Sequence, residues 1–181
     1  MEAGVIHGDI KPQNVLVYKD STGKTTVKVT DFGYSTLATG EAGPGRVFLP
    51  KSRPWNAPEH HFEEFTAVEA KKTDIYSFGM LCFWFLFGHN LSDIPQSTTE
   101  GTTELISFNA PVGPPTLLEQ FKATEKLDHI VNQFLDSRSL AGLNADHRNR
   151  LKEIFSVTVT LNLDKRSSDF RYLLDLLSQE R

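Results

Sequence analysis

Four polar side chains near the start of the sequence have the chemistry that phosphoryl transfer requires. Asp9, Lys11 and Asn14 lie close together, and Asp31 follows two short apolar runs. The reaction needs a carboxylate that orients the attacking hydroxyl and takes its proton, an ammonium that neutralises developing charge, and oxygen ligands for Mg²⁺ on the nucleotide. We assign the base to Asp9, the cation to Lys11, and the metal ligands to Asn14 and Asp31.

A predicted β-hairpin over residues 15–31 brings the two metal ligands together. Residues 15–18 and 27–30 are rich in β-branched side chains, and turn-forming residues separate them. Asn14 and Asp31 stand at the two ends of this hairpin, so both can reach one metal ion. In the other interpretation, the two side chains only cap strand ends, as Asn and Asp often do.

Five landmarks then follow one another in a familiar order. Residues 7–14 (HGDIKPQN) and 31–33 (DFG) resemble the catalytic loop and the magnesium-binding loop of protein kinases. Residues 57–59 (APE) resemble the end of the kinase activation segment, and residues 74–79 (DIYSFG) resemble the start of its central helix. Arg166 lies where that family has an arginine paired with the glutamate of APE, here Glu59. Together these landmarks make the chain similar to the kinase domain from the catalytic loop onward.

The resemblance implies an α+β, protein-kinase-like fold: a mainly helical C-lobe with a small β-hairpin. It places the catalytic loop at 7–14, the activation segment at 31–59, the central buried helix at about 73–88 and C-terminal helices at about 116–178. No glycine-rich loop, strand lysine or helix glutamate precedes His7. We therefore expect the N-lobe, which binds much of the nucleotide, to be absent from this chain.

The resemblance also assigns roles to individual residues. Lys11, Asn14 and Asp31 would contact ATP, and Ser52 takes the place of a threonine that contacts the catalytic aspartate and lysine in serine/threonine kinases. Trp55 replaces the usual tyrosine of the activation segment. A further set would support the site structurally, with Asp74 bonded to the catalytic-loop backbone and Arg166 in a buried ion pair. These supporting residues are His7, Phe32, Gly33, Glu59, Asp74 and Arg166.

Gly8 departs from the family, which commonly has arginine at this position of the catalytic loop. In kinases that are switched on by activation-loop phosphorylation, this arginine helps to receive the phosphate. Glycine offers no charge. We therefore predict that no phosphate docks at this position.

Hydrophobic periodicity predicts the helices. Residues 75–87 are almost entirely apolar and too few to cross a bilayer, so we expect a buried helix with Thr73 or Asp74 as N-cap and Gly88 as its end. Three further helical patterns cover 116–137, 146–161 and 168–178. Apolar side chains at helical spacing mark the expected core faces of the first and third patterns: Leu127, Ile130, Val131, Phe134 and Leu135, then Phe170, Leu173, Leu174 and Leu177.

Composition narrows the possible partners and compartment. Of the 181 residues, 39% are hydrophobic and 23% charged, as in ordinary globular domains. The net charge of −4 gives no reason to expect nucleic acid or a membrane as a partner. One cysteine, Cys82, excludes an internal disulfide and is expected to be inert packing. We expect a protein that is not secreted and lies in the cytoplasm, with the nucleus as the other open compartment.

Two functions remain open from the sequence. One is a serine/threonine protein kinase that uses ATP and Mg²⁺ to phosphorylate protein hydroxyls, with this chain incomplete and inactive alone. A partner protein could then complete the missing lobe. The other is a non-catalytic, kinase-like fragment that acts as a binding module or is an evolutionary relic.

Overall fold

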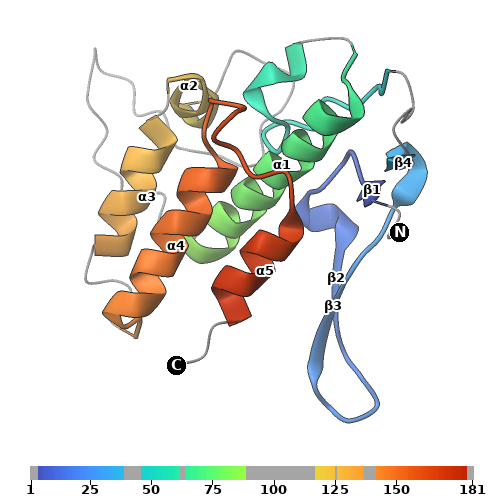
Figure 1. Ribbon diagram of the computed structural model, residues 1–181. Coiled ribbons are helices and arrows are strands. Elements are labelled where there is room, and N and C mark those ends of the chain that lie inside the picture. Colours follow the sequence, from blue (N-terminus) through green and yellow to red (C-terminus); the bar gives the residue numbers. More distant parts are fainter. Residues whose placement is uncertain are drawn as a thin grey trace.

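A computed structural model describes residues 4–38, 46–61, 64–88, 117–124, 126–136 and 142–178. The described part is mainly helical, with two small antiparallel sheets (Figure 1). The strands are β1 (Gly4–Ile6), β2 (Val15–Lys19), β3 (Thr25–Val29) and β4 (Thr36–Ala38). The α-helices are α1 (Ala67–Phe87), α2 (Leu117–Ala123), α3 (Lys126–Asp136), α4 (Ala145–Thr158) and α5 (Phe170–Ser178). Short 3-10 helices are η1 (Pro12–Asn14), η2 (Phe32–Tyr34) and η3 (Pro58–His61). This architecture confirms the predicted fold class.

Helix α1 runs through the middle of the molecule, with α3 and α4 on one side and the small sheets on the other (Figure 1). In one sheet β1 pairs with β4, and in the other β2 pairs with β3 so that Val15 faces Val29. The predicted β2–β3 hairpin is present and projects away from the helices (Figure 1). The Asp20 carboxylate closes its turn by accepting hydrogen bonds from the backbone N–H groups of Thr22 (2.8 Å) and Lys24 (3.1 Å).

Helix α1 begins earlier than the sequence pattern indicates. Its N-cap is Thr66, which forms a capping box with Glu69, whereas Thr73 and Asp74 lie inside the helix. The prediction of an N-cap at Thr73 or Asp74 was therefore wrong. Residues 67–72 are mostly small or charged, so the first turns lack the apolar signal used to find the helix. The C-terminal end is at Phe87, with Gly88 as the predicted cap.

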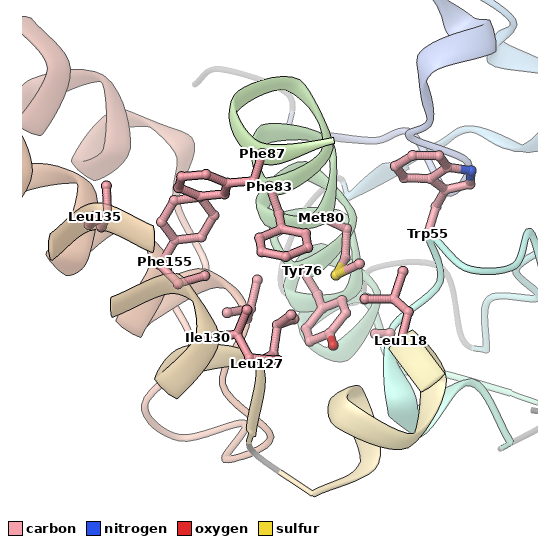
Figure 2. Close-up of a cluster of buried hydrophobic side chains, with 13 residues drawn as sticks. Trp55, Tyr76, Met80, Phe83, Phe87, Leu118, Leu127, Ile130, Leu135 and Phe155 are labelled. Atoms are coloured by element: carbon pink, nitrogen blue, oxygen red, sulfur yellow. The ribbon is translucent and has the colours of Figure 1, made fainter. Parts of the chain in front are cut away.

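The core forms where α1 faces α3 and α4. Figure 2 shows Tyr76, Met80, Phe83 and Phe87 of α1 directed toward side chains of the other helices. The predicted face of α3 is confirmed, because four of its side chains are buried and Phe134 is packed against the same cluster. Those four are Leu127, Ile130, Val131 and Leu135. Cys82 is also packed against this cluster, and burial raises the pKa of its thiol to about 12, which fits inert packing.

Two predictions for the C-terminal helices need correction. The pattern over 116–137 forms two helices, α2 and α3, instead of one. In α5, Leu173 is buried as predicted and so is Leu176, but Phe170, Leu174 and Leu177 are exposed. The reason is that α5 packs against α1 and α4 through Leu173 and Leu176, so Leu174 and Leu177 stay largely exposed. Phe170 meets the ring of Phe78 edge to face at 5.4 Å but is still 38% exposed.

One side of α1 is left open. Phe85 is 75% exposed, although a helix that is apolar all round was expected to be fully buried. Phe85 and neighbouring apolar side chains line a groove of about 510 Å³ between α1, the hairpin, α4 and α5. Its lining includes Val17, Val27, Trp84 and Leu177. Within the described residues, no helix has both the length and the apolar character needed to cross a membrane.

Gly79 allows α1 to approach the end of α4 closely. A Cβ at Gly79 would lie 2.8 Å from Cβ of Thr158 and 2.8 Å from Cγ1 of Val159. Alanine improves helix propensity by about 1 kcal/mol over glycine, but overpacking costs about 1–3 kcal/mol. We expect Gly79→Ala to destabilise the chain by about 1 kcal/mol in urea denaturation. Gly142→Ala is the control, because nothing lies within 4 Å of a Cβ there; equal effects of the two variants would contradict this packing.

Candidate active site

Asp9, Lys11 and Ser52 form the centre of the candidate site. Asp9 is buried, and its Oδ2 accepts a hydrogen bond from Nζ of Lys11 at 2.6 Å. The same ammonium donates to Oγ of Ser52 at 3.2 Å, so the structure brings together the three residues that the sequence grouped. The other oxygen of Asp9, Oδ1, is buried and has no hydrogen-bond partner among the described residues. A buried carboxylate oxygen without a hydrogen-bond donor is uncommon in folded proteins and requires an explanation.

Asn14 lies directly beside Asp9. It sits at the end of η1, and its Nδ2 donates to the backbone oxygen of Asp9 at 2.8 Å and to Oδ2 of Asp9 at 3.4 Å. These hydrogen bonds use the amide nitrogen and not the amide oxygen, which is the atom that would bind a hard cation. The backbone oxygen of Asn14 accepts from the N–H of Thr30 at 2.9 Å. The hairpin therefore brings the residue before Asp31 back to Asn14.

Asp31 caps η2 from an unusual backbone conformation. Its φ of 62° lies in the left-handed region, and its Oδ1 accepts from the N–H of Gly33 at 3.3 Å. Few residues other than glycine adopt this conformation, although aspartate tolerates it better than most. Asp31 thus caps a 3-10 helix and not a strand end, and its exposed carboxylate also stays open to solvent. Phe32 is 56% exposed, and its ring lies 5.0 Å from the ring of His7.

His7 has a structural position. Its Nδ1 accepts a hydrogen bond from the N–H of Asp9 at 3.2 Å, which places the ring proton on Nε2. That nitrogen lies 3.0 Å from the backbone oxygen of Thr30. Both ring nitrogens are used to hold the loop against the hairpin, as expected for a supporting residue.

Asp74 attaches the loop to the central helix. One carboxylate oxygen accepts from the N–H of His7 at 2.6 Å, and the other accepts from the N–H of Gly8 at 2.8 Å. Burial raises the pKa of Asp74 to about 6, although these two hydrogen bonds act in the opposite direction. The predicted bond between Asp74 and the catalytic-loop backbone is present.

Gly8 has a local reason to be glycine. Its φ is +81°, and a Cβ there would lie 3.0 Å from Cδ2 of Leu49 and 3.1 Å from the backbone oxygen of Tyr34. Any side chain at this position would be strained. The absence of an arginine therefore has a backbone cause in this chain, and the absence of phosphate docking stays a prediction.

Glu59 and Arg166 form the predicted buried pair. The guanidinium of Arg166 donates to both carboxylate oxygens of Glu59, with one nitrogen–oxygen distance of 3.2 Å. It also donates to the backbone oxygen of Thr160 at 2.8 Å and lies 4.8 Å from the ring centroid of Tyr76. Arg166 is only 2% exposed, so its charge depends on these partners.

Trp55 lies in the hydrophobic core, whereas Ser52, three residues earlier in the activation segment, contacts Lys11. Trp55 is 4% exposed and belongs to the core cluster (Figure 2). Its ring meets that of Trp84 edge to face at 6.1 Å. This side chain anchors its segment and is not displayed to a substrate. Ser52 alone of the two reaches the centre of the site.

Sequence reasoning missed Lys122, a buried residue of α2 whose ammonium contacts the same segment. Lys122 is 5% exposed, and its Nζ donates to the backbone oxygens of Pro54 and Asn56. A signal was present, because Lys122 lies four residues after the buried Leu118 and so shares its helix face. Lysine on a buried face needs buried acceptors.

The comparisons with known proteins agree with this geometry. The protein kinase domain family matches residues 1–174. The chain is 35% identical over 102 residues to serine/threonine-protein kinase CHK1 of Saccharomyces cerevisiae, covering 55% of this chain and 18% of that protein. It is 31% identical over 116 residues to CBL-interacting protein kinase 20 of Oryza sativa subsp. japonica, covering 60% of this chain and 24% of that protein.

The match over nearly the whole chain shows the family: this protein belongs to the protein kinase domain family. Relatives at modest identity are serine/threonine kinases. The chain spans between 10% and 24% of the length of the first curated relatives that it matches.

The pKa of Asp74 predicts a pH dependence of stability. Because the pKa of Asp74 in the folded chain, about 6, is above the ordinary aspartate value of 3.8, the folded chain holds this proton more tightly between pH 4 and 6. The contribution of Asp74 to the free energy of unfolding therefore falls as the pH rises through this window, by on the order of 3 kcal/mol. The test is urea denaturation of the wild type and Asp74→Asn from pH 4 to 7. Stability curves that stay parallel for the two proteins would show that Asp74 does not titrate there.

The Glu59–Arg166 pair predicts a strong non-additive effect. Either Glu59→Gln or Arg166→Met leaves the other member poorly compensated, which we expect to cost about 3 kcal/mol. The double variant strands no charge, so its loss should be smaller than the sum of the single losses. Urea denaturation measures all three. Lys152→Met is the control, because its exposed pair with Asp136 should contribute less than about 1 kcal/mol. A loss for the double variant equal to the sum would contradict the coupling.

Proposed function

We propose that this chain carries the catalytic half of a serine/threonine protein kinase, which transfers the γ-phosphoryl group of ATP to a protein hydroxyl. The observation that supports the proposal best is the unpartnered Oδ1 of Asp9, buried beside an ammonium. A buried carboxylate oxygen without a donor costs free energy unless a ligand satisfies it. A substrate hydroxyl is such a ligand.

In this proposal, Asp9 accepts a hydrogen bond from the serine or threonine hydroxyl and takes its proton as the oxygen attacks. Lys11 is hydrogen-bonded to Asp9 and would therefore lie close to that hydroxyl. Its ammonium neutralises charge on the moving phosphoryl group. Ser52 holds the ammonium from its other side. Lys11 stands two residues after Asp9, as in serine/threonine kinases, and Ser52 takes the place of their activation-segment threonine. Both features favour serine and threonine over tyrosine as the acceptor.

Asn14 and Asp31 are the residues proposed to hold Mg²⁺. Both offer oxygen ligands of the kind this ion prefers, and the hairpin brings their backbones together through Thr30. Bound Mg²⁺ would neutralise charge on the phosphates of ATP. Asp31 would supply a carboxylate, and Asn14 its amide oxygen while its nitrogen keeps the Asp9 backbone in place.

The side of the site near Asp31 is open among the described residues. Phe32 and Tyr34 are 56% and 53% exposed, although both are aromatic. We propose that another polypeptide segment, from a longer chain or from a partner protein, covers this side and completes the nucleotide site. This chain alone would then have little kinase activity, because the phosphates are not held in line for transfer.

The experiment is a phosphorylation assay on the longest natural form of the protein with ATP, Mg²⁺ and peptides. We expect activity on peptides with serine or threonine, and a loss of about a hundredfold or more in kcat for Asp9→Asn, the range for a lost general base. Asp175→Asn is the control, since this exposed carboxylate of α5 is remote from the site residues in sequence. Equal activity of Asp9→Asn and the control, or a preference for tyrosine-only peptides, would refute the proposal.

A further inference from the structure

Lys122 is a buried cation that ties α2 to the segment after Ser52. Its Nζ donates to the backbone oxygen of Asn56 at 2.7 Å and to that of Pro54, and it lies 5.7 Å from the ring centroid of Tyr76 in α1. Removing an ammonium from water is costly unless acceptors replace the water. Here backbone carbonyls of one short segment fill that role.

Residues 52–56, which include the two residues that Lys122 contacts, form a backbone turn that begins at Ser52. The backbone oxygen of Ser52 accepts from the N–H of Trp55 at 2.9 Å and from that of Asn56 at 3.1 Å. The carbonyls that contact Lys122 therefore belong to the same turn that begins at Ser52. A displacement of Pro54 and Asn56 would move Ser52 with them.

The Ser52 side chain continues this connection to the catalytic loop. Its Oγ accepts from Nζ of Lys11, which also donates to Asp9. A continuous series of hydrogen bonds thus leads from α2, through one backbone turn, to the lysine proposed to contact the phosphoryl group. Lys122 lies 111 positions after Lys11 in the sequence, so only the folded chain makes this connection.

We propose that Lys122 is a positioning residue, which fixes the turn at residues 52–56 so that Ser52 holds Lys11 beside Asp9. The proposal rests on the proposed kinase function for its catalytic consequence, while its structural part stands on the contacts alone. A methionine at position 122 would fill similar space but leave the backbone oxygens of Pro54 and Asn56 without this donor. The predicted effect is local to the turn and to Lys11.

The structural part is tested by limited trypsin digestion of Lys122→Met, with Lys126→Met as the matched control from the exposed start of α3. Trypsin cleaves after Lys51, at the edge of the turn, and after Lys152 inside α4, which reports unfolding of the helical body. We expect cleavage after Lys51 to accelerate about tenfold relative to cleavage after Lys152, as for loss of about one charge-assisted hydrogen bond. An unchanged ratio in both variants would overturn the proposal.

The catalytic part is tested by kinetics on the longest natural form, with Lys122→Met, Ser52→Ala and the double variant. We expect Lys122→Met to lower kcat about tenfold with little change in KM for ATP, because Lys11 acts on the transition state. The double variant should be no slower than Ser52→Ala, since both changes act through one contact. Additive losses, or equal kcat for Lys122→Met and Lys126→Met, would overturn the proposal.

The two arms separate this inference from the proposed function. A wild type that has no kinase activity refutes the proposed function, and the digestion ratio then still decides whether Lys122 holds the turn. A kinase that is active but insensitive to Lys122→Met retains the proposed function and refutes the positioning role.

Discussion

The geometry of the site depends on one buried carboxylate, that of Asp74. It accepts the backbone N–H groups of two successive residues, His7 and Gly8, and so fixes the start of the catalytic loop to the central helix. Because these hydrogen bonds come from backbone N–H groups, the carboxylate sets the path of the loop and not merely the position of one side chain. Asp9 is the next residue in the sequence. Its buried carboxylate can stay in place because Asp74 fixes the backbone of the two residues before it.

Tyr76, two residues later in α1, lies between two buried cations. The guanidinium of Arg166 and the ammonium of Lys122 both lie over its ring. Aromatic faces stabilise desolvated cations, so one side chain of α1 serves two distant parts of the chain. The cations differ in their other partners: Arg166 has the carboxylate of Glu59, whereas Lys122 has backbone carbonyls. Lys122 therefore binds the start of the segment from Pro54 to Glu59, and Arg166 binds its end.

The resemblance to kinase motifs predicted several contacts of the site, including contacts between residues far apart in the sequence. The contacts of Asp9, Lys11 and Ser52, the hairpin that returns to Asn14, and the Glu59–Arg166 pair all follow from motifs at recognisable spacing. Patterns could not predict the start of α1, because a capping box at Thr66 and Glu69 stabilises turns that have no apolar stripe.

Other features were missed because they depend on tertiary neighbours. The spacing of Leu174 and Leu177 fits a core face, but α5 packs against α1 and α4 through Leu173 and Leu176, and Leu174 and Leu177 are exposed. Trp55 was assigned to the activation segment from its place in a motif, whereas the fold buries it in the core cluster beside Trp84. Lys122 belongs to no motif, and although its helical spacing from Leu118 suggested a buried position, only the fold shows which carbonyls accept its hydrogen bonds.

The contacts that hold the site join residues far apart in the chain. The Asp74–Gly8 hydrogen bond spans 66 positions, and the Arg166–Glu59 bond spans 107. Closing such long loops costs entropy that is repaid only when the joined elements have packed, so these contacts belong to the late steps of folding. A growing or partly folded chain would contain the residues of the candidate site without their arrangement. The geometry of the site therefore arises only when the distant elements have packed together.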